Sequence, residues 1–151
     1  MLMIEGAHEL KSREGGLIGA SDWLLIDQAA VDQFADVTKD HQWIHVDVNR
    51  ARTSAFGGTI VHGYFALALV PRLAATVYKV TGFRYGLNYG LNRVRFPAPL
   101  PVGSEIRVRI EVLSVTSVSE TDVQLAARNT VECSGLDKPV CVAETLTRYV
   151  A

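Results

Sequence analysis

The sequence has few cysteines and no excess of charge of either sign. Its two cysteines, Cys133 and Cys141, lack the Cys-x-x-Cys spacing of metal or redox sites. They are expected to be buried free thiols in a reducing compartment. Fifteen basic residues are balanced by sixteen acidic ones, which leaves a formal charge of −1 and no surplus positive charge to neutralise a phosphate backbone. A nucleic-acid partner is therefore not expected.

Signals for membrane insertion and export are also missing. The most apolar stretch runs from Tyr64 to Pro71 and stops at Arg72, well short of the roughly 18 apolar residues of a membrane span. The first ten residues, MLMIEGAHEL, have no basic start and only four apolar residues before Glu5. These absences predict a cytoplasmic protein with no membrane partner.

The length and composition indicate one globular domain. The chain has 151 residues, 48% of them hydrophobic, and a chain of this size buries roughly 68–70% of its unfolded surface without a disulfide or a structural metal. No repeat, low-complexity tract or linker divides it. Three glycines cluster in Glu14–Ala20, so residues 1–20 are expected to be a loosely ordered N-terminal extension of a single domain spanning 1–151.

Two helices are expected in the first half of the chain. The segment from Asp27 to Val37 has one apolar face, with Asp27 as its N-cap. The segment from Ile60 to Tyr78 is apolar on nearly every side, so this helix should be buried. Pro71 lies inside it, and an interior proline costs about 3 kcal/mol or bends the axis. A kink or a break is therefore expected at Pro71.

The second half, from about Tyr85, has the alternation of strands. Residues 104–112 place apolar side chains on one face and charged side chains on the other. Similar alternation over 121–133 and 138–150, with Gly135 in the turn between them, predicts an antiparallel meander. Such a sheet has one apolar face to cover, and the apolar helix is the only long element available. The predicted fold class is α+β, a curved antiparallel sheet wrapped around a central helix.

Titratable residues crowd together in the segment Thr38–Asp47. Asp40 and His45 would be separated by about 140° on a regular helix, whereas on a turn both can reach one water molecule. An Asp/His pair can hold and deprotonate water, because imidazole titrates near neutral pH and the carboxylate orients it. A solvated turn with helix-capping aspartates explains the same residues.

A metal site is another interpretation of the same region. His41, His45, Asp47 and His62 offer possible ligands, but no cysteine-rich ligand pattern accompanies them. No metal is therefore expected.

A second cluster, FGGTIVHGYF, runs from Phe56 to Phe65. Thr59 is a candidate cap for the apolar helix, and Gly63 lies in its first turn. Backbone N–H groups there have no partner within the helix, so the Gly63 N–H can hold a carbonyl oxygen that gains negative charge. Close helix–sheet packing explains Gly63 equally well, and His62 can be a satisfied polar residue at a helix start.

Three motifs in this order resemble those of the MaoC-like dehydratases, the (R)-specific enoyl-CoA hydratases of hotdog fold. They are DHQWIHVD over 40–47, FGGTIVHG over 56–63, and RFPAP over 95–99 followed by Val102-Gly103. The resemblance covers roughly Ser21 to the C-terminus. It is greatest to the short single-domain members, which include mycobacterial 3-hydroxyacyl-thioester dehydratases and the nodulation-protein-N-like group.

The resemblance implies a homodimer that adds water to a trans-2-enoyl-CoA and forms the (3R)-3-hydroxyacyl-CoA, without a cofactor. In that family the aspartate and histidine that bind the catalytic water fall on Asp40 and His45. The glycine whose amide forms the oxyanion hole falls on Gly63. His62, beside this glycine, is a candidate substrate contact.

The sequence departs from the family pattern in two places. Many members have Asn-Pro where Gln42-Trp43 stands, and some carry a serine beside the catalytic aspartate that is missing here near Pro71.

Further substrate contacts are expected on the strand that follows the apolar helix. Asn88 and Asn92 are candidate side-chain donors, although capping of the strand start explains them as well. Arg95 is a candidate contact for CoA phosphates, or else a solvated strand charge.

Two alternatives to a hydratase remain open within the same fold. An acyl-CoA thioesterase also needs a carboxylate-activated water and a helix N-terminus at the carbonyl, but the Asp-x4-His spacing favours the hydratase. A non-catalytic acyl-binding module has no need for two buried titratable groups.

Overall fold

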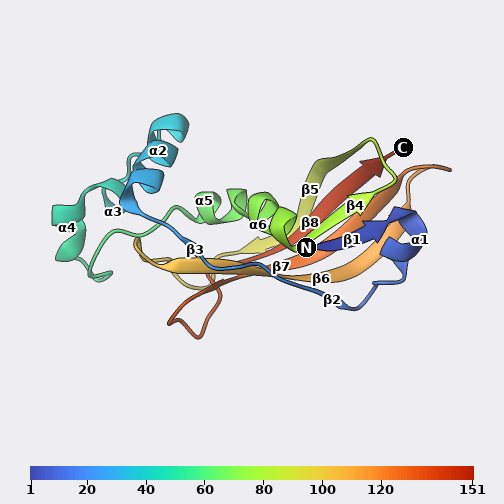
Figure 1. The fold of residues 1–151 in the computed structure, drawn as a ribbon. Coiled ribbons are helices and arrows are strands. Elements are labelled where there is room, and N and C mark those ends of the chain that lie inside the picture. Colours follow the sequence, from blue (N-terminus) through green and yellow to red (C-terminus); the bar gives the residue numbers. More distant parts are fainter.

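A six-stranded antiparallel sheet and two short helices form the framework of the molecule in the computed structural model, which describes residues 1–151 (Figure 1). The elements in chain order are β1 (Leu2–Glu5), α1 (Gly6–Lys11), β2 (Leu17–Ala20), β3 (Leu24–Leu25), α2 (Gln28–Thr38), α3 (Trp43–Val46), α4 (Val48–Arg52), α5 (Gly63–Ala68), α6 (Val70–Val77), β4 (Tyr78–Thr81), β5 (Tyr85–Arg95), β6 (Glu105–Ser117), β7 (Val123–Cys133) and β8 (Cys141–Val150). None of the helices is both long and apolar enough to cross a membrane.

The strands are arranged in the order β2-β6-β7-β8-β5, and β3 pairs with β6 beside β2. The predicted meander is confirmed, because β6, β7 and β8 pair in succession and antiparallel. β6 extends to Ser117, beyond the expected end at Val112, and an irregularity between Val112 and Ser114 lets the longer strand continue. Gly135, at a φ of +81°, forms the predicted turn between β7 and β8.

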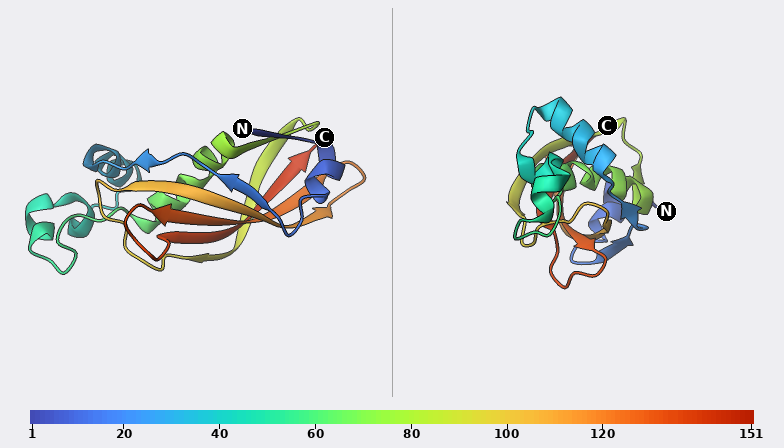
Figure 2. Two further views of the ribbon diagram at one scale, coloured as in Figure 1. Left: turned by 60° about the horizontal axis from the view of Figure 1, so that its bottom comes forward. Right: turned by 90° about the vertical axis from the view of Figure 1, so that its left-hand side faces the viewer.

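The apolar helix lies along one face of this sheet, as predicted, but it begins later and is broken. Seen end-on, the strands curve partly around α5 and α6 (Figure 2). α5 ends at Ala68 and α6 begins at Val70, so the break falls just before Pro71. Proline is tolerated there because N–H groups in the first turn of a helix have no acceptor within the helix, so the missing N–H of proline breaks no hydrogen bond. The expected Thr59 cap is wrong: His62 is the N-cap, and the Thr59 hydroxyl bonds Gln28 instead.

The core lies between the helices and the inner face of the sheet. Four alternate residues of β6 are completely buried: Ile106, Val108, Ile110 and Val112. They belong to one cluster of 24 buried residues that includes Val70, Leu73 and Val77 of α6. Cys133 and Cys141 are buried and free, as expected. This packing agrees with the period-two pattern read from the sequence.

The N-terminal residues 1–20 correct an expectation, since they are not a loose extension. β1 pairs in parallel with β4, and β2 pairs with β6 at the edge of the main sheet. Ile4 and Leu10 are completely buried in the same core cluster. The glycine cluster correctly indicated loops. The burial of Ile4 and Leu10, which precede it, was not predicted, and this burial orders the segment.

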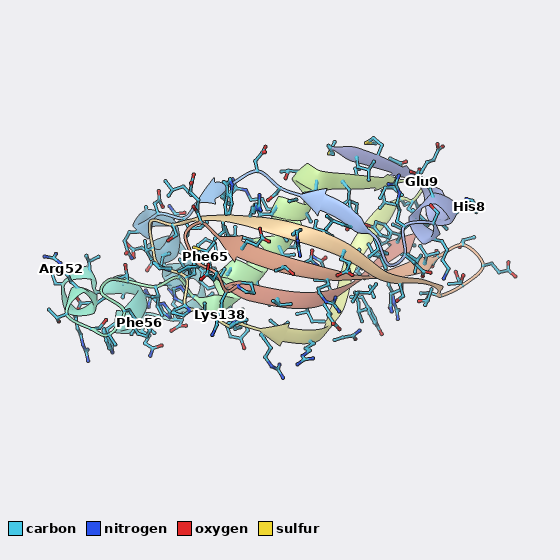
Figure 3. All side chains as sticks on the ribbon, turned by 90° about the horizontal axis from the view of Figure 1, so that it is seen from below. His8, Glu9, Arg52, Phe56, Phe65 and Lys138 are labelled. Atoms are coloured by element: carbon cyan, nitrogen blue, oxygen red, sulfur yellow. The ribbon has the colours of Figure 1, made fainter.

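α2, α3 and α4 form an overhang at one end of the molecule, beyond the N-terminus of α5 (Figures 1 and 2). α2 begins as predicted, with the Asp27 side chain accepting the Ala30 N–H at 2.9 Å. In Figure 3, Arg52 and Phe56 lie at the outer tip of the overhang and Phe65 near its base, while Glu9 marks the opposite end of the molecule. The overhang therefore contains the segment in which titratable residues crowd together.

Candidate active site

The turn after α2 brings Asp40 close to α3. Lys39 caps α2 in the left-handed conformation at a φ of +63°, the one non-glycine residue with a positive φ. This reverses the chain so that Asp40 opens the loop into α3, which contains His45. The two residues are thus on a turn and a short helix rather than on one regular helix, as the sequence predicted.

His45 has a defined tautomer. Its Nδ1 lies 2.6 Å from the carbonyl oxygen of Ile60, so Nδ1–H donates and Nε2 keeps a free lone pair. The ring is buried, and this burial is the largest cause that lowers its pKa below the ordinary value of 6.5, against the opposing effect of the Ile60 hydrogen bond. The nearby His62 lowers the pKa further, and Asp40 raises it. A neutral imidazole with an unprotonated Nε2 is the form required of a general base.

Asp40 contributes an exposed carboxylate to the same place. Its side chain is 53% exposed and accepts no hydrogen bond from the protein. One carboxylate oxygen of Asp40 and one ring nitrogen each of His45 and His62 lie within 4.8 Å of one another. The two residues predicted to share one water molecule are therefore close enough to do so.

His62 lies behind this pair. Its ring stacks on the ring of His45 with centroids 3.8 Å apart and an angle of 25° between the planes. Its Nε2 is 3.0 Å from the backbone oxygen of Asp40, and its Nδ1 is buried without a partner. Only 2% of the residue is exposed. This burial does not favour the predicted direct contact with substrate.

Gln28 holds the segments of the site together, and the sequence analysis missed it. Its side-chain amide donates to the backbone oxygen of His45 at 2.8 Å and accepts from the Thr59 hydroxyl at 2.6 Å. It therefore links the first turn of α2 to α3 and to the loop before α5. A glutamine one position after a predicted N-cap gave no local signal of this role, because both partners are distant in sequence.

Gly63 is the first residue of α5, as predicted, so its N–H has no acceptor within the helix. A Cβ at this position would lie 3.1 Å from carbon atoms of the Phe96 ring. Phe96 is itself 41% exposed and lies beside Tyr64. The sequence motif RFPAP included Phe96 without assigning it to the site, and the structure places it against the candidate oxyanion amide.

The remaining predicted contacts lie on β5. Asn88 lines two cavities next to α5 and α6. Asn92 is exposed and occupies the irregularity between Leu91 and Arg93. Arg95 lines a different cavity with Arg128 and Glu144. Because Thr145 faces the helices and neighbouring strand residues alternate, Glu144 and Arg95 lie on the outer face of the sheet.

The two cavities beside Asn88 run along the seam between the helices and strands β5 and β8. Their volumes are about 270 and 260 Å³, and they share four lining residues: Val70, Pro71, Asn88 and Thr145. Leu67 and Leu91 line one of them, and Ala74 and Asn129 the other. Leu67 is one helical turn after Gly63, so this space begins close to the candidate oxyanion amide.

The residues do not fit a metal ion. His41 and His45 have the spacing His-x-x-x-His, but His41 is turned outward and contacts Asp36 at 2.8 Å, and Asp47 caps α4. His45 and His62 do meet, but as stacked rings. Imidazole lone pairs lie in the ring plane, so two stacked rings with centroids 3.8 Å apart do not direct them at one ion at the usual ~2.0–2.1 Å.

Several known proteins are similar to this chain. The MaoC-like domain family matches residues 10–133. 3-Hydroxyacyl-thioester dehydratase Z of Mycobacterium tuberculosis is 48% identical over 100% of both chains. Nodulation protein N of Rhizobium leguminosarum bv. viciae is 38% identical over 92% of this chain and 88% of its own length. Among solved structures, the R-hydratase PhaJ1 from Pseudomonas aeruginosa has a TM-score of 0.69 at 26% identity, and the match covers 91% of this chain and 81% of that one.

The fold and the site thus define a hotdog-fold protein with a paired aspartate and histidine at the N-terminus of its central helix. The chain belongs to the MaoC-like dehydratase family.

Proposed function

We propose that this chain catalyses the reversible hydration of a trans-2-enoyl-CoA to the (3R)-3-hydroxyacyl-CoA, and so acts as a hydro-lyase. The observation that carries the proposal is the convergence of the Asp40 carboxylate and the His45 imidazole beside the first turn of α5. The full-length identity of 48% to a protein named 3-hydroxyacyl-thioester dehydratase supports it.

In this mechanism Asp40 and His45 hold one water molecule between them. The free Nε2 of His45 takes a proton as the water oxygen forms its bond to C3 of the substrate, and the carboxylate of Asp40 orients the water. The proton then passes to C2 on the same face, which completes the addition. Water is the only co-reactant, and no cofactor takes part.

Gly63 stabilises the charge that develops on the substrate. As water attacks C3, the thioester oxygen gains enolate character, and the Gly63 N–H donates a hydrogen bond to it. Contacts of this type typically contribute about 3–4 kcal/mol to the transition state when they are well placed. The absence of a side chain leaves this face of the Gly63 backbone uncovered, with the Phe96 ring as its nearest neighbour.

The acyl chain is expected in the cavities along α5 and α6, with Asn88 as a polar contact in their wall. Asn92 and Arg95 stay predictions for contacts with the CoA portion. The burial of His62 does not favour a contact with substrate.

The exposed edge of the sheet supports a homodimer. β5 pairs only with β8, and ten of its eleven residues are exposed. Tyr85, Leu87, Tyr89 and Leu91 are each about half exposed on this strand. An unpaired apolar edge favours pairing with a second strand, and a second copy of β5 would cover it.

A cytoplasmic location and a single MaoC-like domain complete the proposal. The buried free thiols of Cys133 and Cys141 suit a reducing compartment. One core cluster contains residues from Ile4 to Ala143, which supports one domain over 1–151.

The test is an assay with crotonyl-CoA and longer trans-2-enoyl-CoAs. Hydration removes the ultraviolet absorbance of the conjugated enoyl thioester, and an (R)- or (S)-specific dehydrogenase assigns the configuration of the product. We expect loss of absorbance and an (R) product. Release of free CoA, measured with a thiol reagent, would identify a thioesterase instead, and an inert protein that binds acyl-CoA would identify a binding module.

A further inference from the structure

No hydrogen bond to the Asp40 side chain explains the position of its carboxylate. The carboxylate accepts no hydrogen bond from the protein, and the nearest histidine nitrogen, the Nε2 of His62, is 4.0 Å from Oδ2. The Asp40 N–H has only a long contact of 3.4 Å to the Thr38 hydroxyl. Whatever holds this carboxylate beside His45 must therefore act mainly through the Asp40 backbone.

His62 supplies that backbone contact. A carbonyl oxygen can only accept, so the His62 Nε2 carries the proton and donates to the Asp40 oxygen at 3.0 Å. In the neutral ring this leaves Nδ1 as an acceptor, and Nδ1 is buried without a partner. His62 is also the N-cap of α5, yet its side chain makes no capping hydrogen bond. The hydrogen bond to Asp40 is therefore the one polar contact that the buried ring makes.

The ring that makes this contact packs against two other rings. One face stacks on His45 at 3.8 Å, and Phe34 lies against it with centroids 5.0 Å apart. Phe34 in turn stacks on Phe65 of α5 at 4.8 Å. His62 therefore connects α2, the Asp40 loop, α3 and α5. It contacts both Asp40 and His45.

We propose that His62 is a positioning residue, which holds Asp40 beside His45 by donating a hydrogen bond to the Asp40 backbone oxygen, and that it does not bind substrate. Its kinetic consequence rests on the proposed hydratase function. The Asp40–His62 contact itself does not depend on that function and can be measured without it.

Two amide substitutions test this contact with closely matched chemistry. In His62→Gln the side-chain N–H is at about the reach of Nε2, whereas in His62→Asn it is one methylene too short. His41→Gln is the control for kcat and KM, because His41 is an exposed histidine next to Asp40 in the sequence. Each variant is assayed for kcat and KM with crotonyl-CoA and for thermal unfolding. An HNCO spectrum, which correlates the Asp40 carbonyl carbon with the His41 amide, reports the hydrogen bond without any need for activity.

We expect His62→Asn to lower kcat about tenfold or more with KM within about threefold, since a displacement of a reacting group by about 1 Å can reduce the rate 10²-fold. His62→Gln should recover most of kcat, and His41→Gln should match the wild type. The Asp40 carbonyl resonance should move in His62→Asn and stay near its wild-type position in His62→Gln.

Three results would overturn the proposal. A rise in KM at constant kcat in His62→Asn would show that His62 binds substrate. Equal losses of kcat in both amide variants, in proportion to their thermal unfolding, would show a general structural role. An Asp40 carbonyl resonance unmoved in His62→Asn would show that the contact is missing in solution. An inert wild type with the expected carbonyl pattern would refute the hydratase function while supporting the contact.

Discussion

Gly63 and Phe96 are in close contact although one begins the central helix and the other follows strand β5. A Cβ built on Gly63 would lie 3.1 Å from the Phe96 ring, closer than nearly all real side-chain contacts. The Phe96 ring is partly exposed. The Phe96 ring therefore limits the space on the side of Gly63 where a side chain would lie.

Gly63→Ala is expected to reduce catalysis far more than stability. The added methyl group would displace the Phe96 ring and occupy the approach to the N–H, so kcat should fall about tenfold or more. The midpoint of thermal unfolding should change little, because alanine is favoured over glycine in a helix and the ring can turn away. The control is Gly58→Ala, whose Cβ meets nothing within 4 Å. Unchanged kcat in Gly63→Ala would show that the substrate does not need the open side of Gly63, since alanine keeps the backbone N–H.

Asp40→Asn and His45→Gln should each lower kcat by about 10²–10⁴-fold while the protein stays folded, because His45 takes the proton of the water and Asp40 orients that water. The measurement is the initial rate of crotonyl-CoA hydration, with circular dichroism to confirm the fold. Asp47→Asn is the matched control, since Asp47 lies in the same segment but accepts the Arg50 N–H as a helix cap. If this control loses as much activity as Asp40→Asn, the assignment of Asp40 is wrong.

The acid limb of kcat/KM should lie below pH 6.5, the ordinary pKa of histidine, because burial lowers the pKa of His45. Activity is retained as long as Nε2 is unprotonated, so it should persist into mildly acidic solution. Rates from about pH 5 to 8 with a stable substrate measure this limb. A limb at or above the ordinary value would contradict the buried, neutral state of His45.

The lowered pKa of His45 also makes the stability of the folded protein depend on pH. As pH falls below 6.5, the unfolded chain takes up a proton at His45 while the folded chain does not. The unfolded state then binds more protons, so the contribution of His45 makes the folded protein less stable as pH falls through this range. The effect should be absent in His45→Gln, and urea unfolding of both proteins at two pH values tests it.

Leu87→Glu should convert the proposed dimer to a monomer, because it puts a charge on the exposed edge strand β5. Analytical ultracentrifugation gives the mass directly. Leu136→Glu is the control, since Leu136 is a comparably exposed leucine in the loop between β7 and β8. A wild type that sediments as a monomer, or a Leu136→Glu protein that dissociates equally, would contradict the β5 interface.

Leu10→Ala is expected to lower the free energy of unfolding by about 2–5 kcal/mol, as is usual for a fully buried leucine. Leu17→Ala, in the same segment but 61% exposed, should have little effect. Denaturant unfolding compares the two. Equal, small effects would mean that residues 1–20 are loose after all.

The sequence was most informative where one element decides its own structure. Asp27 caps α2 through a local hydrogen bond to Ala30, and Pro71 marks the helix break because its ring and missing N–H act within one turn. The alternation over β6 identified its buried face for the same reason. Predictions were wrong where contacts between residues far apart in the sequence determine the structure. Thr59 looked like a cap, but its hydroxyl bonds Gln28, and residues 1–20 looked loose because their partners, β4 and β6, come much later in the chain.

By itself, the sequence determined the fold class, the order of the strands in the meander, and the motifs that contain Asp40, His45 and Gly63. Periodicity, caps and turn residues act over a few positions and can be recognised without a partner. Only the tertiary structure decided the tautomer of His45, the stacking of His62 on it, the link through Gln28 and the ring of Phe96 over Gly63. Each of these contacts joins residues from different elements, so its geometry exists only once the chain has packed.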